Sequence, residues 1–137
     1  MCSGPSMPHQ RQVSKAKSHA ISGQSSGMER STALVLAQFG ARVSFCDHNK
    51  RRIAQVEAEI VPSSLYGKHG VLSNSVYIEN VGEVVAWIHA FVDKFGRLDG
   101  AINAVALEAS KVVSITEMKS PTWHTAINAN LPQLKHD

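Results

Sequence analysis

The chain has 137 residues and a formal charge of +3, from 14 Lys and Arg against 11 Asp and Glu. Hydrophobic residues make up 43% and charged residues 18%. This ordinary globular usage excludes a disordered polyelectrolyte, a collagen-like chain and a disulfide-rich miniprotein. The length suits one domain, and no apolar run approaches the roughly 18 residues that span a bilayer.

The excess positive charge lies near the N-terminus, where Arg11, Lys15 and Lys17 precede the first acidic residue, Glu29. Residues 1–16 lack the apolar run of a secretory signal, and we expect a flexible basic tail there. The rest of the chain is neutral and has no basic face. We therefore expect no nucleic-acid partner.

The chain has only two cysteines, Cys2 and Cys46. They are too few for a disulfide framework, which favours a reducing compartment, and we expect a cytoplasmic protein. Cys46 lies in an apolar run and is expected to pack inertly in the core. No histidine has the spacing to Cys or carboxylates that a metal site needs, so we expect no metal.

Apolar periodicity alternates along the chain between the spacing of strands and that of helices. The predicted elements, in chain order, are strand 18–21, helix 28–39, strand 43–46, helix 50–60, a weak strand at 71–72, helix 81–95, strand 98–105 and helix 117–130. Gly40 and Gly96 stand where helices end in a left-handed residue, and Pro62 marks the end of helix 50–60. This alternation predicts an α/β fold, a parallel sheet covered on both faces.

Helix 81–95 has the clearest pattern, with apolar residues at steps of three and four over four turns. The predicted buried stripe consists of Val81, Val84, Val85, Ile88, Val92 and Phe95. Trp87 lies beside this stripe, so we expect it to make a packing or surface contact.

A glycine-rich turn follows the first predicted strand and opens the first helix, with Gly23 and Gly27 as its glycines. Asp47 comes 24 residues after Gly23, at the end of the second strand. A dinucleotide-binding βαβ unit requires these three features. The glycines let a pyrophosphate approach backbone N–H groups at a helix N-terminus. Asp47 either accepts hydrogen bonds from the adenosine ribose or is an ordinary strand-end or helix-capping acid.

Three segments carry a resemblance to the short-chain dehydrogenase/reductase family. Residues 22–29, SGQSSGME, resemble its T-G-x-x-x-G-x-G loop, and residues 98–106, LDGAINAVA, resemble its fourth strand with the N-N-A-G motif. Residues 123–131 resemble the helix that bears the family's active-site Asn. The segments occur in the family's order from about residue 17 to 131. The resemblance implies a Rossmann-like doubly wound parallel sheet, here incomplete, with about four strands and flanking helices in residues 17–137.

The resemblance also implies a nucleotide cofactor, NAD or NADP, and an acid at Asp47 favours NAD because it repels a 2′-phosphate. The implied cofactor-binding residues are Ser22, Gly23, Ser25, Ser26, Gly27, Met28, Asp47, Asn74 and Asn103. The implied catalytic position is Asn130, the only family position of that kind in the chain.

Several residues depart from the family pattern. Glu29 replaces the third glycine of the loop, and Asn74 stands where the family usually has an Asp that holds the adenine ring. Only the first Asn of N-N-A-G remains, at Asn103, and Pro132 and Gln133 replace the small residue and Gly after the helix. The family's catalytic Ser and Tyr-x-x-x-Lys pair would follow Asp137.

Glu29 has two interpretations. Its carboxylate repels a pyrophosphate at the helix start, which weakens dinucleotide binding. Alternatively, Ser26 and Glu29 form an S-x-x-E capping box, in which case the helix caps itself without a phosphate. The two interpretations are compatible, because a helix capped in this way no longer needs the phosphate.

Two function classes follow. In the first, the chain is a fragment of an NAD(P)-dependent oxidoreductase, and this fragment is inactive in hydride transfer because it lacks the family's proton-transfer residues. Alternatively, it is a non-catalytic remnant that binds a protein partner through the exposed edge of its fourth strand. We expect the isolated chain to self-associate through that edge or to be marginally stable.

Overall fold

The structure is a computed structural model that describes residues 17–23, 27–105, 114 and 116–130. Four parallel strands form one sheet in the order β3–β2–β1–β4. The strands are β1 (Ser18–Ser22), β2 (Arg42–Asp47), β3 (Val71–Ser75) and β4 (Gly100–Asn103). This order confirms the predicted doubly wound sheet, in which the chain returns to the middle before its fourth strand.

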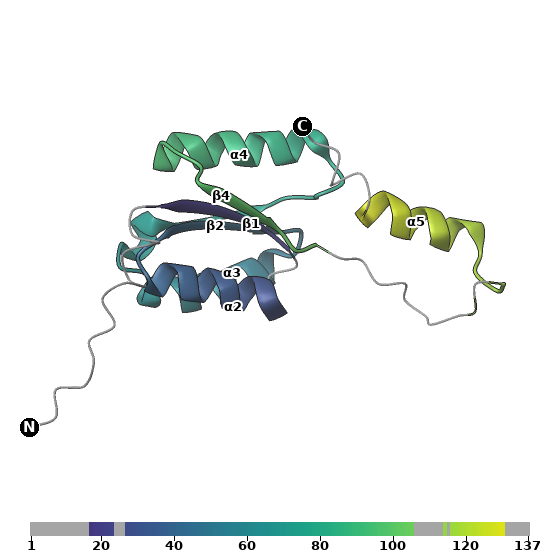
Figure 1. The fold of residues 1–137 in the computed structure, drawn as a ribbon, viewed down its shortest axis with the longest axis horizontal. Helices are drawn as coiled ribbons and strands as arrows, with labels where there is room; N and C mark the ends of the chain where they lie inside the picture. Colours follow the sequence, from purple (N-terminus) through teal and green to yellow (C-terminus); the bar gives the residue numbers. More distant parts are fainter. Residues whose placement is uncertain (1–16, 24–26, 106–113, 115, 131–137) are drawn as a thin grey trace, which may run out of the picture.

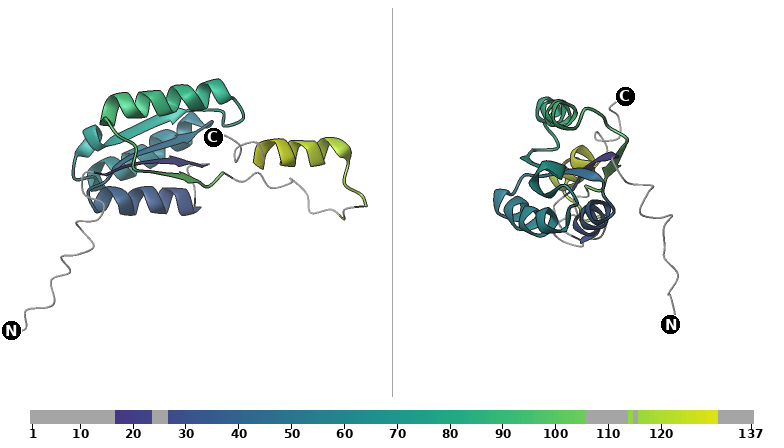
Figure 2. Two further views of the ribbon diagram at one scale, coloured as in Figure 1. Left: turned by 45° about the horizontal axis from the view of Figure 1, so that its top comes forward. Right: turned by 90° about the vertical axis from the view of Figure 1, so that its left-hand side faces the viewer.

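Helices cover both faces of the sheet (Figure 1). Helices α2 (Gly27–Gln38) and α3 (Lys50–Ser63) lie on one face, and α4 (Val81–Phe95) lies alone on the other, as the end-on view of Figure 2 shows. A short 3₁₀ helix, η1 (Gly67–Gly70), leads into β3, and α5 (Ser120–Asn130) lies apart from the sheet. None of the helices in the described ranges is long and apolar enough to cross a bilayer.

Each face of the sheet has its own hydrophobic core. On the α2 and α3 face, the core is built from Ile21, Ala33, Ala37, Ala41, Val43, Phe45, Ile53, Val56, Ile60 and Val71. On the α4 face it is built from Ala20, Cys46, Val76, Trp87, Phe91 and Phe95. Successive strand residues point to opposite faces, which is why Ala20 and Ile21 belong to different cores.

The predicted buried stripe of α4 is wrong in part. Phe95 is buried, and Val84 and Ile88 are partly buried, but Val81, Val85 and Val92 are 49%, 48% and 41% exposed. The helix instead buries Trp87, Phe91 and Phe95, three large side chains at steps of four. Apolar residues occupy two faces of this helix, and burying the aromatic face removes more apolar area from water.

Other helix ends differ from the predictions by a few residues. Helix α3 continues past Pro62 to Ser63, and the Ser64 N–H closes it by donating to the carbonyls of Ile60 and Val61. Helix α5 begins at Ser120 rather than at residue 117, with Pro121 in the first turn, where the missing N–H costs nothing. Gly96 ends α4 in the left-handed conformation, as predicted, at φ 75°.

The strand lengths also differ from the predictions. The weak strand predicted at 71–72 extends over five residues as β3, because every residue from Val71 to Ser75 pairs with buried β2. The strand predicted at 98–105 is reduced to the four residues of β4, since only β1 pairs with it.

The α4 face contains one buried polar contact. The indole Nε1–H of Trp87 donates to Ser44 Oγ at 2.8 Å, and both residues are buried. Ser18, at the start of β1, is equally buried, but its Oγ has no partner among the described residues. The two serines therefore form a matched pair, one with a hydrogen-bond partner and one without.

We expect Ser44→Ala to lower the free energy of unfolding by about 2 kcal/mol, because it leaves a buried indole N–H without an acceptor. Ser18→Ala removes a hydroxyl without a partner and should be neutral or slightly stabilising. Urea denaturation followed by circular dichroism compares the two. Equal losses of stability would contradict the assigned contact.

Candidate functional site

The predicted nucleotide-binding residues of the four strands meet at one edge of the sheet. Because the strands are parallel, their carboxyl ends lie at the same edge, where α/β proteins bind ligands. The register places Asn74, Cys46, Ser22 and Asn103 in one row across β3, β2, β1 and β4. Ser22 Oγ donates to Asn103 Oδ1 at 2.9 Å, which ties the two neighbouring strand ends together.

The glycine-rich turn lies at the middle of this edge, after β1. Gly27 has φ 58°, in the left-handed region that favours glycine, so the right-handed backbone of α2 starts at Met28. Glu29 is therefore the second right-handed residue, whereas a capping box with Ser26 would need it third. Of the predicted loop residues, Ser25 and Ser26 lie outside the described residues.

The side chain of Glu29 lies directly over Gly23. A Cβ atom placed on Gly23 would lie 2.2 Å from Glu29 Cγ and 2.9 Å from Oε1, so any other residue at this position would require the Glu29 side chain to move. The other carboxylate oxygen, Oε2, faces Gly27 and lies 3.9 Å from a Cβ atom placed there. The carboxylate of Glu29 thus lies between the two glycines that bracket the loop.

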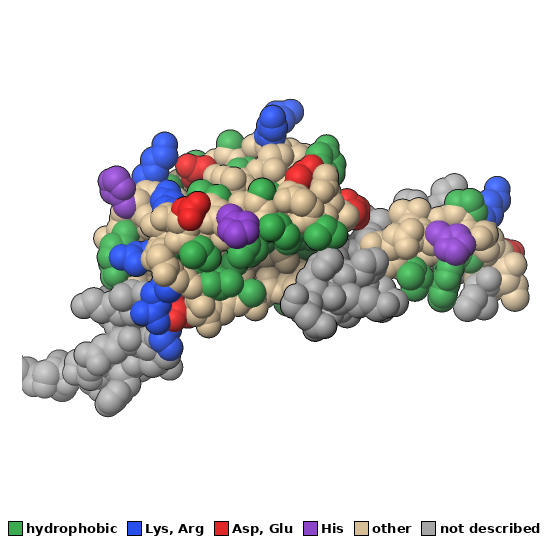
Figure 3. Space-filling model, turned by 90° about the horizontal axis from the view of Figure 1, so that it is seen from above, with side chains coloured by type: hydrophobic (Ala, Val, Ile, Leu, Met, Phe, Trp, Pro, Cys, Tyr) green, Lys and Arg blue, Asp and Glu red, His purple; other side chains and the backbone are tan. Residues whose placement is uncertain are grey.

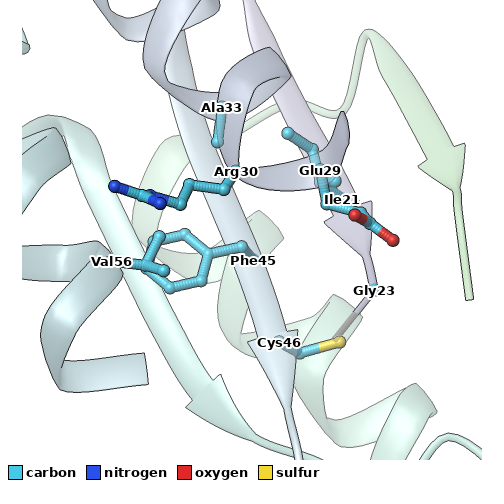
Figure 4. Close-up of a pocket in the computed structure, with 8 residues that line it drawn as sticks. All are labelled: Ile21, Gly23, Glu29, Arg30, Ala33, Phe45, Cys46 and Val56. Atoms are coloured by element: carbon cyan, nitrogen blue, oxygen red, sulfur yellow. The ribbon is translucent and has the colours of Figure 1, made fainter. Parts of the chain in front are cut away.

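A shallow hollow, with room for little more than a water molecule, opens beside this turn (Figure 4). Its lining consists of Ile21, Gly23, Glu29, Arg30, Ala33, Phe45, Cys46 and Val56. The Glu29 carboxylate and the Arg30 guanidinium point in opposite directions. Arg30 instead pairs with Glu59, its Nε lying 2.7 Å from Glu59 Oε2, so its charge is directed away from the loop.

Sequence reasoning assigned Cys46 to inert packing and missed its place at the site. The thiol lies beside Gly23, whose backbone N–H hydrogen bonds to it. Burial raises the pKa of Cys46 to about 12, so the group stays a neutral thiol and does not act as a nucleophile at neutral pH. Its position could have been read from the sequence, because it directly precedes Asp47 in a strand that ends at this edge.

Asp47 ends β2 and is 2% exposed. Its Oδ1 accepts the Asn49 N–H at 2.8 Å and lies 3.3 Å from His48 Nδ1. Its Oδ2 is buried and has no partner among the described residues. The N-cap of α3 is Asn49 rather than Asp47, since the Asn49 side chain accepts from the N–H groups of Arg51 and Arg52.

Asn74 provides a second unpaired acceptor at this edge. Its Oδ1 is buried and has no hydrogen-bond partner among the described residues, like Asp47 Oδ2 on the neighbouring strand. A buried acceptor without a donor costs free energy. Two such atoms lie on adjacent strands at the carboxyl edge, and neither presents accessible surface to a ligand in this conformation.

The remaining predicted residues contribute less. Met28 is 79% exposed at the start of α2. Asn130 is the last residue of α5, which lies apart from the sheet, and its side chain lies outside the described residues. Among the described residues, no three His, Cys, Asp or Glu side chains gather to hold a metal ion.

Comparison with known proteins fits this geometry. The family model for short chain dehydrogenases matches residues 17–134, which is most of the chain. This chain belongs to the short chain dehydrogenase family. Members of the family bind NAD(P).

Individual relatives match over most of this chain. A protein of Botryotinia fuckeliana named short-chain dehydrogenase/reductase aba4 is 34% identical over 114 residues, covering 82% of this chain and 43% of the relative. A (2S)-[(R)-hydroxy(phenyl)methyl]succinyl-CoA dehydrogenase subunit of Thauera aromatica is 32% identical over 111 residues, covering 81% and 41%. The chain spans less than half the length of these relatives.

Solved structures agree with the fold. A short chain dehydrogenase from Bacillus anthracis superposes with a TM-score of 0.78 at 27% identity, covering 89% of this chain and 47% of that one. The 3-ketoacyl-(acyl-carrier-protein) reductase of Brucella melitensis, solved with NADH, superposes with a TM-score of 0.75 at 24% identity, covering 88% and 47%.

The carboxyl edge of the sheet meets the requirements of a dinucleotide only in part. Asp47 ends β2, as the ribose end of such a site requires, but Asp47 Oδ2 and Asn74 Oδ1 are buried and present no surface to a ligand in this conformation. At the turn, the Glu29 side chain lies over Gly23 and brings a carboxylate to the place where a pyrophosphate approaches the backbone in this fold.

Proposed function

We propose that this chain is the nucleotide-binding half of a short chain dehydrogenase in which dinucleotide binding is weakened and hydride transfer does not occur. The position of the Glu29 carboxylate over Gly23 supports the first part most directly. A negative charge at the start of α2 opposes the negative charge of a pyrophosphate, and no ion pair joins Glu29 to another described residue.

The proposal that these 137 residues do not transfer hydride rests on proton chemistry. Reduction of a carbonyl needs a general acid beside the oxygen, which the family supplies with a Tyr-x-x-x-Lys pair. The two tyrosines of this sequence are Tyr66 and Tyr77, and the residues four positions later are Gly70 and Val81. Neither tyrosine therefore belongs to a Tyr-x-x-x-Lys pair.

At the other end of the site, Asp47 supports a preference for NAD over NADP. It is an acid at the end of β2, the position that binds the adenosine ribose in this fold, and its Oδ2 has no hydrogen-bond partner among the described residues. A 2′-phosphate in place of that hydroxyl would bring two negative groups together. We also propose a cytoplasmic location, because two cysteines suit a reducing compartment.

We expect Glu29→Gly to bind NAD about ten-fold more tightly than the unchanged chain, because it removes the charge and opens the space over Gly23. Isothermal titration calorimetry measures both affinities. Glu79→Gly is the matched control, since Glu79 is an exposed carboxylate in the loop before α4. Equal affinity of the Glu29→Gly variant and the unchanged chain would overturn the proposed role of Glu29.

A second candidate function is an interaction module, and the sheet edge favours it. Strand β4 ends the sheet order and pairs only with β1. It is tied there by the Asp99 N–H, which donates to the Ser18 carbonyl at 2.9 Å, and by the Ser18 N–H, which donates to Asp99 Oδ2 at 2.8 Å. Its free backbone edge can accept a further strand.

The apolar side of α4 adjoins this edge. Val81, Val85 and Val92 are exposed on α4, and the space-filling view from that side shows hydrophobic side chains gathered along it (Figure 3). Contiguous exposed apolar surface of this kind marks an interaction site in soluble proteins. We propose that a second copy of the chain covers it.

We expect Val85→Glu to raise the dissociation constant of self-association about ten-fold, because it places a charge in the apolar contact. Leu65→Glu is the matched control, because Leu65 is 68% exposed in the loop after α3 and away from α4. Sedimentation velocity over a concentration series gives the constants. A wild-type chain that stays a monomer throughout, with one sharp unfolding transition at high temperature, would contradict this candidate.

A further inference from the structure

We propose that two copies of this chain join by antiparallel pairing of their β4 strands about a two-fold axis at Ile102, so that their four-stranded sheets become one continuous sheet. The proposal rests on the second candidate of the proposed function, self-association, and names the contact that makes it. It follows from the free backbone groups of β4, from the side chains that would meet, and from the different state of the opposite sheet edge.

The free backbone groups of β4 belong to alternate residues. The Ala104 N–H donates to the Ser22 carbonyl at 2.9 Å, and the Ile102 carbonyl accepts from Ser22 Oγ at 3.4 Å. Both residues therefore direct their backbone groups toward β1. Because N–H and C=O groups point to alternate sides along a strand, those of Ala101 and Asn103 face the other side. No described strand lies there, and β4 ends the sheet order (Figure 1).

These free groups are complementary to themselves in one register. With Ile102 on the two-fold axis, Ala101 of each copy lies opposite Asn103 of the other. Each such pair can exchange both of its N–H···O=C bonds, as the hydrogen-bonded pairs of an antiparallel ladder do. Since both copies present the same strand, this contact is isologous and closes at two copies.

The side chains of β4 suit the same register. Ile102 packs against the core on the α2 and α3 face, and on the axis it would lie opposite Ile102 of the second copy. Cross-strand pairs of β-branched residues stabilise a sheet. The segment from Gly100 to Val105 contains no charged residue and no proline. The edge thus lacks the charges and prolines by which strands avoid pairing with one another.

The opposite edge of the sheet, at β3, is occupied by a lysine. The Val76 N–H donates to the Asp47 carbonyl at 3.0 Å, so the same alternation places the Val71 carbonyl on the free side of β3. Lys94 Nζ donates to that carbonyl at 2.8 Å. A lysine at a strand edge opposes the approach of a further strand. Pairing is therefore expected at β4 and not at β3, which limits the assembly to a dimer.

The variants Ile102→Cys and Ala101→Cys, each in a chain that also carries Cys2→Ser, test the register. On the axis the two Cα atoms lie about 4.5 Å apart, which a disulfide can span, whereas those of Ala101 lie diagonally at about 7–8 Å, which it cannot. Burial raises the pKa of Cys46 to about 12, so this thiol does not compete.

We expect glutathione disulfide to convert Ile102→Cys to a covalent dimer at least about ten-fold faster than Ala101→Cys, measured by non-reducing electrophoresis. A second measurement needs no variant. In a mixture of ¹³C-labelled and unlabelled chains, the pairing predicts a cross-peak between the Ile102 Hα protons of the two copies, because Cα atoms approach most closely in such a pair. Sedimentation velocity should reach the mass of a dimer and no more.

The outcomes separate this inference from the function on which it rests. If the chain dimerises but the two cysteine variants crosslink at equal rates, or the Hα cross-peak is missing, the β4 register is wrong and self-association stands. If the unchanged chain stays a monomer throughout the concentration series, self-association and this inference both fail.

Discussion

The contact between Glu29 and Gly23 determines what this site can hold. Gly23 begins the turn after β1, and the Glu29 side chain lies so close to it that a Cβ atom could be added only if Glu29 moved. On the other side of the same glycine lies the Cys46 thiol, which accepts the Gly23 N–H. Gly23 is thus packed between the buried Cys46 thiol and the Glu29 side chain. Glu29 occupies the space that a glycine at position 29 would leave open.

This closure divides the site into two halves with different chemistry. At the loop, the chain's own carboxylate takes the position suited to an anion. At the ends of β2 and β3, Asp47 and Asn74 keep buried acceptors without a partner among the described residues. Under the proposed function, a change at one residue of α2 therefore weakens dinucleotide binding while the strands keep their positions.

The same sheet leaves its two faces unequally covered. Helices α2 and α3 bury one face, whereas among the described helices α4 alone covers the other, and it keeps three valines exposed. Buried apolar surface is the main favourable term in folding, so this face contributes less than it would under a second helix. The interaction candidate and the weakened nucleotide site thus belong to different parts of the molecule, and each can be tested without the other.

Local signals in the sequence predicted the fold well. The left-handed Gly96, the extent of α4 and the 3–2–1–4 strand order follow from backbone rules and from the family resemblance. The buried face of α4 was misjudged, because Val81 and Val85 fit the helical period as well as Trp87 and Phe91 do, and only the opposing sheet decides between them. The sequence placed Glu29 at the loop and indicated its charge. Its position over Gly23 depends on the packing of α2 against β1, and no local pattern shows it.

The central claim is that the Glu29 side chain lies over Gly23 in solution. Nuclear Overhauser spectroscopy on isotopically labelled protein measures this contact between the Glu29 Hγ and Gly23 Hα protons. The account predicts a strong cross-peak, because Glu29 Cγ lies against the Gly23 backbone. Its absence, with Glu29 side-chain shifts like those of an exposed glutamate, would show that the carboxylate leaves the loop open and would contradict the account.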